Sequence, residues 1–256
     1  MFEAKVWGDA PAGFRRLPMG RNQVIMIREG LESLIHKNCV LQGDLKKEES
    51  PFYGRDKLYR LRLENGETAV IRHYRHGGLI RFLSGDVFFS WPPRPFKELA
   101  ITEEVRRRGI PTLEILAAWI EKLWGPFYRG WLVTRELRGA DDLWAARQSC
   151  GSGGDDGGAV LRAAARSLRR MHRQGIYHKD LNLKNILIRR EAEEIRSYII
   201  DFDKARLFPA PVPSEKSRKN LKRLYRSVCK LDSKRYYFSE EDWSRFMSFY
   251  EEAGEG

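Results

Sequence analysis

A short stretch of the sequence, IYHKDLNLKNILI (residues 176–188), places one histidine, one aspartate and two asparagines directly before an apolar run. A buried strand accepts such groups only where they are hydrogen-bonded or in use. Carboxylate and amide oxygens can bind hard metal ions, and a carboxylate can also accept a proton. We therefore interpret this stretch as a loop with a chemical role that leads into a core strand.

A second polar group follows the next apolar run, where YII precedes DFD at residues 201–203. The segment between the two stretches can fold as a hairpin. Such a hairpin would bring Asn185 and Asp201 side by side at neighbouring strand ends. The two stretches together thus predict one constellation of polar side chains.

This constellation resembles the protein-kinase signature, H-R-D-x-x-x-x-N followed by D-F-G. HKDLNLKN matches the first part position for position, and DFD replaces DFG. The resemblance implies that Asn185 and Asp201 bind Mg²⁺ and that Asp180 orients an acceptor hydroxyl and accepts its proton. Asn182 lies where many kinases have a lysine near the transferred phosphate, and we assign it to the catalytic group. His178 is expected to organise the loop.

The first half of the chain departs from the kinase pattern, because it contains no GxGxxG motif. Gly54 is the one glycine at the expected strand turn before the hairpin. In the resemblance, AVIR takes the place of V-A-I-K. Val70 and Arg72 share one face of a strand, so that Val70 would contact adenine and Arg72 the phosphates. Glu98 is the expected helix partner of Arg72, and Glu136 belongs to LVTREL, the expected adenine-binding hinge.

The surrounding pattern predicts the elements that must position these residues. The expected elements, in chain order, are a weak strand pair or helix at 22–34, a hairpin at 57–74 with an Asn-Gly turn, a helix at 94–109, strands at 113–121 and 128–137, a Gly-rich loop at 148–158, a helix at 159–175, short strands at 185–188 and 197–207, and a helical tail from 216. They define an α+β, two-lobed, kinase-like fold. Residues 1–137 form its strand-rich N-lobe and residues 138–256 its mainly helical C-lobe.

The composition limits the class of protein. The chain has 256 residues, 42% of them hydrophobic, which is enough for a proper core. Three scattered cysteines without a CxxC motif argue against a disulfide framework or a zinc site and favour a reducing cytoplasm. The N-terminus does not read as a signal peptide, and no stretch is apolar enough to span a bilayer. We expect a soluble or peripherally attached protein whose net charge of +12 favours an anionic partner.

Several further stretches resemble the 3-deoxy-D-manno-octulosonic acid (Kdo) kinases of the lipopolysaccharide-kinase group. They are RHYRHGGL, RPFKELAITEEVRRRGIP, DLNLKNIL and DFDKAR, within residues 53–207, and more loosely FSEEDWSRFMSFY near the C-terminus. The resemblance implies phosphorylation of the Kdo 4-hydroxyl in a Kdo–lipid A precursor, with ATP and Mg²⁺ as cofactors. It also implies a peripheral position on the cytoplasmic face of the inner membrane. The expected partners are ATP, this anionic glycolipid and the membrane surface, and no nucleic acid.

Other functions stay open on the sequence alone. A heptose kinase or an antibiotic phosphotransferase would share the fold and the loop chemistry. A protein serine/threonine kinase is less favoured, because no A-P-E triplet follows the DFD motif and little room is left for an activation segment. A non-catalytic module that binds an anionic ligand is disfavoured by the joint presence of Asp180, Asn185 and Asp201.

Overall fold

The structure is a computed structural model that describes residues 10–32, 58–63, 65–75, 85–150, 155–192 and 194–252. The chain divides into two compact units. The first contains residues 1–103 and 114–136, and the second contains residues 104–113 and 137–256. The predicted α+β class is confirmed. The assignment of nucleotide binding to residues 1–137 and of acceptor chemistry to residues 138–256 stays a prediction.

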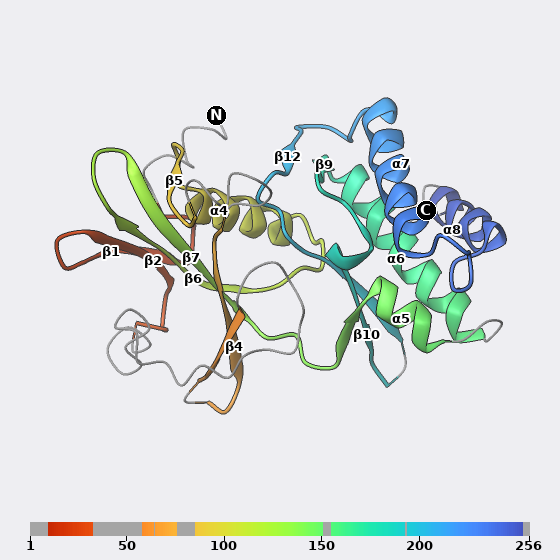
Figure 1. Ribbon diagram of the computed structural model, residues 1–256, viewed down its shortest axis with the longest axis horizontal. Coiled ribbons are helices and arrows are strands. Elements are labelled where there is room, and N and C mark those ends of the chain that lie inside the picture. The colour runs from red at the N-terminus through yellow and green to blue at the C-terminus, as the bar shows by residue number, and fades with distance from the viewer. Residues whose placement is uncertain are drawn as a thin grey trace. The chain divides into compact units, whose positions relative to one another are not determined.

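The first unit is built on one seven-stranded sheet in the order β1-β2-β6-β7-β4-β3, with β5 paired to β7 (Figure 1). Its strands are β1 (Phe14–Met19), β2 (Gln23–Arg28), β3 (Leu58–Arg62), β4 (Thr68–His73), β5 (Phe88–Phe89), β6 (Ile115–Lys122) and β7 (Phe127–Arg135). It also contains α4 (Arg94–Arg107) as far as Glu103. Every pairing is antiparallel.

Both faces of this sheet are covered by apolar side chains. Successive residues of a strand point to opposite faces, so the strands contribute to two clusters alternately. Ala118 of β6 packs in the cluster that contains Leu99 of α4. Trp119, the next residue of β6, packs in the cluster that contains Ile71 of β4. Burial of Ala69, Ile71 and His73 on one face fixes the register of β4, because a one-residue slip would exchange its two faces.

Most of the elements predicted for this unit are confirmed. The hairpin is β3–β4, and its turn is closed by the hydrogen bond from the Gly66 N–H to the Leu63 carbonyl, with Gly66 at a φ of 80°. The predicted helix is α4, and Gly109 follows it at a φ of 75°, where a side chain is unfavourable. The weak prediction at 22–34 corresponds in part to a strand pair, which begins earlier, at Phe14.

The second unit is mainly helical and carries two small sheets. Its helices are α5 (Leu143–Ser149), α6 (Asp155–Arg173), η1 (Leu183–Asn185), α7 (Ser214–Leu231) and α8 (Glu240–Glu252), and its strands are β8 (Ala140–Asp142), β9 (Ile176–Tyr177), β10 (Ile186–Arg190), β11 (Ile195–Ile199) and β12 (Arg206–Leu207). The sheets have the orders β11-β10-β8 and β12-β9. Figure 1 shows α6, α7 and α8 gathered within this unit. None of the helices in the described residues has the length and apolarity needed to cross a membrane.

One prediction for this unit is partly wrong, because α6 already begins at Asp155, inside the stretch 148–158 that was predicted to be a loop. Glycines are poor helix formers, so composition favoured a loop. The helix tolerates Gly157 for a packing reason. A Cβ atom there would lie 2.3 Å from Nη1 of Arg147, so the glycine leaves room for the guanidinium in its present position. Acidic residues in a first helical turn, such as Asp156, also favour the helix.

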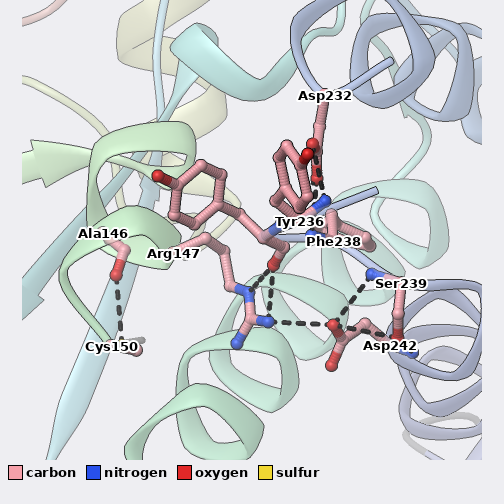
Figure 2. Close-up of polar contacts among 9 residues, drawn as sticks. Ala146, Arg147, Cys150, Asp232, Tyr236, Phe238, Ser239 and Asp242 are labelled. Carbon is pink, nitrogen blue, oxygen red and sulfur yellow. Dashed lines mark hydrogen bonds and ion pairs between the residues drawn. The ribbon is translucent and has the colours of Figure 1, made fainter. Parts of the chain in front are cut away.

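The connection between α7 and α8 is held by two buried charged side chains (Figure 2). Asp232 accepts hydrogen bonds from the backbone N–H groups of Tyr236, Tyr237 and Phe238 at 2.7–2.9 Å. The Arg147 guanidinium donates to the Tyr237 carbonyl at 2.7 Å and to Asp242 at 2.9 Å. The connection therefore presents its polar backbone groups to charged partners rather than to the apolar core.

We expect Asp232→Ala to destabilise the fold, because three backbone donors lose a charged acceptor in a site where Asp232 is only 4% exposed. The expected loss is about 2–4 kcal/mol of unfolding free energy, or about 5–15 °C in the melting temperature. Thermal unfolding followed by circular dichroism measures it. The exposed Asp141→Ala serves as the control and is expected to melt close to the wild type. Equal melting of both variants would show that the Asp232 contacts contribute nothing to stability.

Candidate active site

The loop predicted to be catalytic runs from the end of β9 into η1, and His178 organises it from within the core. His178 is 1% exposed. Its Nε2–H donates to the Ile200 carbonyl at 2.9 Å, and its Nδ1 accepts from the Asp180 N–H at 3.2 Å. Burial lowers the pKa of His178 below its ordinary value. One neutral tautomer satisfies both contacts, so His178 acts as a fixed structural bridge, as the sequence predicted.

A buried amide on α7 holds the backbone of the same loop. Asn220 is fully buried. Its Nδ2 donates to the His178 carbonyl at 2.7 Å, and its Oδ1 accepts from the His178 N–H at 3.2 Å. The same Oδ1 is 3.0 Å from Nε2 of His172 on α6, whose Nδ1 is 2.7 Å from the Tyr250 hydroxyl on α8. Three helices are thereby connected to the loop through one chain of hydrogen bonds.

The Asp180 carbonyl gathers the two asparagines of the loop. It accepts from Asn182 Nδ2 at 2.8 Å and from Asn185 Nδ2 at 3.0 Å. Asn182 also caps η1, since its Oδ1 accepts from the Lys184 N–H at 2.9 Å. Both ends of the Asn182 amide are therefore engaged inside the loop. Its predicted place beside the transferred phosphate stays a prediction.

The predicted hairpin between the two motifs is present as β10–β11. Ile186 pairs with Ile199, and the Ile200 N–H donates to the Asn185 carbonyl at 3.0 Å. Asp201 is thus only one residue beyond the partner of Asn185. It adopts a left-handed backbone conformation with a φ of 67°, which is uncommon for a residue other than glycine. Such outliers are found at functional sites more often than elsewhere.

The Asp180 side chain lies at the surface of this unit between two cations. Its carboxylate is 40% exposed, with Lys204 Nζ 2.7 Å from Oδ2 and Arg223 Nη1 3.5 Å from Oδ1. Burial raises the pKa of Asp180, but the hydrogen bond and charge of Lys204, with the charge of Arg223, outweigh it and hold the pKa below its ordinary value. The group is therefore a carboxylate at neutral pH, ready to accept a hydrogen bond from a hydroxyl.

In the first unit, Arg72 is paired with Glu98 as the sequence predicted. Nη2 of Arg72 donates to Glu98 Oε2 at 2.5 Å and contacts the Tyr74 hydroxyl at 3.1 Å, and Tyr74 also hydrogen-bonds the same Glu98 oxygen. Glu98 is 3% exposed, so this carboxylate depends on both partners. Val70 and Arg72 are half-buried on one face of β4, as period two requires.

The structure gives fewer contacts for the other residues that the sequence predicted to bind the nucleotide. Gly54 lies outside the described residues. The Glu136 N–H donates to the Thr68 carbonyl at 2.8 Å, and its carboxylate forms an ion pair with Arg60 at 2.6 Å. The contacts of Val70, Arg72 and Glu136 with a nucleotide stay predictions.

Sequence reasoning missed three residues that surround the loop. Asn220 lies on the buried stripe of α7 with Leu221, Leu224 and Val228. A lone asparagine on an apolar helix face is the signal that could have revealed it. Lys204 follows the DFD motif directly, but its contact with Asp180 depends on how the chain turns after β11. Arg223 is one of many basic residues on α7, and nothing in the pattern distinguishes it.

The chain is similar to known proteins over most of its length. Residues 49–250 match the model of the lipopolysaccharide kinase (Kdo/WaaP) family. Among curated proteins, the chain is 30% identical over 190 residues to the 3-deoxy-D-manno-octulosonic acid kinase of Mannheimia succiniciproducens, covering 73% of this chain and 76% of that protein. It is 33% identical to the protein of the same name from Vibrio vulnificus, covering 72% and 75%.

A solved structure confirms the kinase-like fold. The chain of "WaaP in complex with acyl carrier protein" superposes with a TM-score of 0.55 at 19% identity, covering 88% of this chain and 83% of that one. At this identity the likeness concerns the fold alone.

The buried His172 predicts how stability depends on pH. Burial is the main cause that lowers its pKa from 6.5 to about 4. Between these values the unfolded state binds a proton that the folded state lacks, so stability falls as the pH falls from about 6.5 to about 4. We expect a loss of about 3 kcal/mol from this group. Melting temperatures of the wild type and of His172→Gln across this range provide the measurement.

In His172→Gln the remaining slope is expected to be shallower by about one proton, because glutamine can still donate to Asn220 without titrating. Parallel pH profiles for the two proteins would contradict the assignment of His172 as a neutral, buried group.

Proposed function

The chain belongs to the lipopolysaccharide kinase (Kdo/WaaP) family, and from this premise we propose that it transfers the γ-phosphate of ATP to the 4-hydroxyl of Kdo in a Kdo–lipid A precursor. It is a phosphotransferase that acts on a sugar hydroxyl in lipopolysaccharide core biosynthesis. Family membership sets aside the alternative of a non-catalytic binding module. The observation that supports the chemistry most strongly is the loop in which Asp180, Asn182 and Asn185 are tied together at one carbonyl.

In the proposed mechanism, Asp180 accepts a hydrogen bond from the acceptor hydroxyl and aligns its oxygen for attack. Phosphoryl transfer passes through a loose transition state in most analyses, so the hydroxyl proton moves late and a strong base is not required. A carboxylate of lowered pKa therefore suits the role. His178 keeps the Asp180 backbone in place, and Asn220 keeps His178 in place.

The residues proposed to hold Mg²⁺ fit that ion in ligand type. The Asn185 N–H₂ group donates to the Asp180 carbonyl, and its Oδ1 accepts no hydrogen bond from any residue that the structure describes. Asp201 contributes a carboxylate at the neighbouring strand end. Within the described ranges no group of three or more His, Cys, Asp or Glu side chains forms a metal site. Mg²⁺ commonly takes one or two protein oxygens with phosphates and water, and it neutralises phosphate charge when bound.

We propose that ATP is bound by the first unit through the residues that the kinase resemblance singles out. Arg72 keeps its charge at every physiological pH and binds phosphate oxygens with a planar fork. Its ion pair with Glu98 and its contact with Tyr74 fix the guanidinium on β4. Val70, on the same face, would contact the adenine ring.

Two features support a proposed peripheral position on the cytoplasmic face of the inner membrane. In the second unit, α7 presents a row of exposed basic side chains that we call the basic row, namely Lys219, Lys222, Arg226 and Lys230. In the first unit, the exposed Phe89 and Trp124 both contact the ring of Phe127. Basic side chains are attracted to anionic headgroups, and aromatic rings favour the membrane interface.

The acceptor assay tests the function. We expect label from the ATP γ-phosphate to appear on a Kdo–lipid A precursor and not on the same lipid without Kdo, nor on a protein substrate. EDTA is expected to abolish transfer. Asp180→Asn is expected to reduce the rate about 10²-fold or more while ATP still binds. Label on a heptose or on an aminoglycoside with none on Kdo would keep the kinase assignment and contradict the proposed acceptor.

The role of Arg72 predicts an ATP-specific defect. Arg72→Ala is expected to lower kcat/KM for ATP at least about tenfold, because a hydrogen bond to a charged group is lost. Arg72→Lys keeps the charge but not the fork, so we expect partial activity. Steady-state kinetics with ATP as the varied substrate measure both, with the exposed Arg62→Ala on β3 as a matched control. If Arg72→Ala matches this control, Arg72 does not contact the phosphates.

The proposed membrane contact predicts selective binding to anionic vesicles. The chain is expected to sediment with phosphatidylglycerol vesicles and not with phosphatidylcholine vesicles, and less so as salt is raised. Removing Lys222 and Arg226 by substitution with Gln is expected to weaken binding about fivefold for each charge. Equal sedimentation with both lipids, or with neither, would count against the basic row as a membrane surface.

A further inference from the structure

We propose that Lys204 and Arg223 bind the carboxylate of the acceptor sugar and so select an acidic sugar over a neutral one. The inference rests on the proposed function, in which Asp180 orients the acceptor hydroxyl. It adds a specificity site to that function, because neither residue lies in HKDLNLKN or in DFD.

Lys204 and Arg223 lie close enough to Asp180 to contact an acceptor sugar that is bound there. A group 2.7 Å from the carboxylate that receives the hydroxyl proton is within contact distance of the sugar that bears that hydroxyl. Lys204 is at this distance from Asp180 Oδ2, and Arg223 is 3.5 Å from Oδ1. Their side chains are 58% and 44% exposed, so an incoming ligand can reach them.

The local charge favours an anion. Within the part of the chain that the structure describes, Asp180 is the only ion-pair partner of either Lys204 or Arg223. Two cations on one carboxylate leave a net charge of about +1 for these three groups. The Arg223 contact is long for a hydrogen bond, and a guanidinium has five N–H donors. Most of its capacity therefore remains for a carboxylate, which it binds in a bidentate fork.

The backbone that carries Arg223 is fixed to the loop on both sides. Three residues before it, Asn220 binds the His178 backbone. Four residues after it, the Ser227 hydroxyl accepts from the Leu183 N–H at 3.2 Å. The base of the Arg223 side chain is therefore positioned by the same contacts that position Asp180. Such pre-organisation is what a specificity site needs.

The base of Lys204 is also held close to the motifs. It lies in the turn after β11, where the Ala205 N–H donates to the Phe202 carbonyl at 2.9 Å. Phe202 is fully buried and packs against the ring of His178. The turn is therefore tied to the core beneath the loop.

The test compares two acceptors that differ only in this charge. They are a synthetic Kdo–lipid A precursor and the same compound with the Kdo carboxylate as its methyl ester. We expect wild-type kcat/KM to be at least about tenfold higher for the acid, as for a lost hydrogen bond between charged groups. In Lys204→Gln and Arg223→Gln this preference is expected to shrink to about threefold or less, because kcat/KM falls more for the acid than for the ester.

The matched control is Arg218→Gln, another exposed arginine of α7, which lies about 140° around the helix from Arg223. It is expected to keep the full preference for the acid. Equal use of acid and ester by the wild type would overturn the proposal while the kinase function stands. Equal losses on both acceptors in the variants would also overturn it, because the residues would then act in catalysis or folding. Phosphate on neither acceptor would contradict the proposed function itself.

Discussion

A loop of polar backbone groups against a buried core needs partners inside the protein, and the amide of Asn220 supplies them. It hydrogen-bonds both the N–H and the carbonyl of His178. The His178 ring in turn connects the Asp180 N–H with the carbonyl of Ile200, the residue directly before DFD. The position of the Asp180 carboxylate thus depends on one fully buried side chain of α7. His172 and Tyr250 extend the same network into α6 and α8. The helices of the second unit therefore act as the scaffold of the loop.

Around this loop, the buried histidines are neutral and the positively charged side chains lie at the surface. The two buried histidines, His178 of the loop and His172 of α6, are neutral, because burial lowers the pKa of both. Cations lie outside, with Lys204 and Arg223 on Asp180. The neutral histidines keep fixed hydrogen bonds beneath the loop, and the cations at the surface suit the anionic acceptor that we propose.

The sequence predicted the elements that have strong local signals. Alternating apolar residues and the Asn65-Gly66 turn predicted β3–β4, and apolar periodicity predicted α4 and most of α6. The pair of Arg72 with Glu98 followed from the motif and is present. The early start of α6 was missed because its first turns contain Gly157 and Gly158, and glycine favours a loop on composition alone. Asn220 and Arg223 were missed because their contacts arise only when α7 packs beside the loop, and Lys204 because its contact depends on the turn after β11.

The most direct test of the central claim is the position of the new phosphate in the product. After reaction of the purified chain with ATP and a Kdo–lipid A precursor, phosphorus–proton correlation spectroscopy identifies the carbon that bears the phosphate. The mechanism predicts coupling of one new phosphorus to the proton on C4 of Kdo. Coupling to a proton of another sugar, or a phosphate found only on protein, would contradict it.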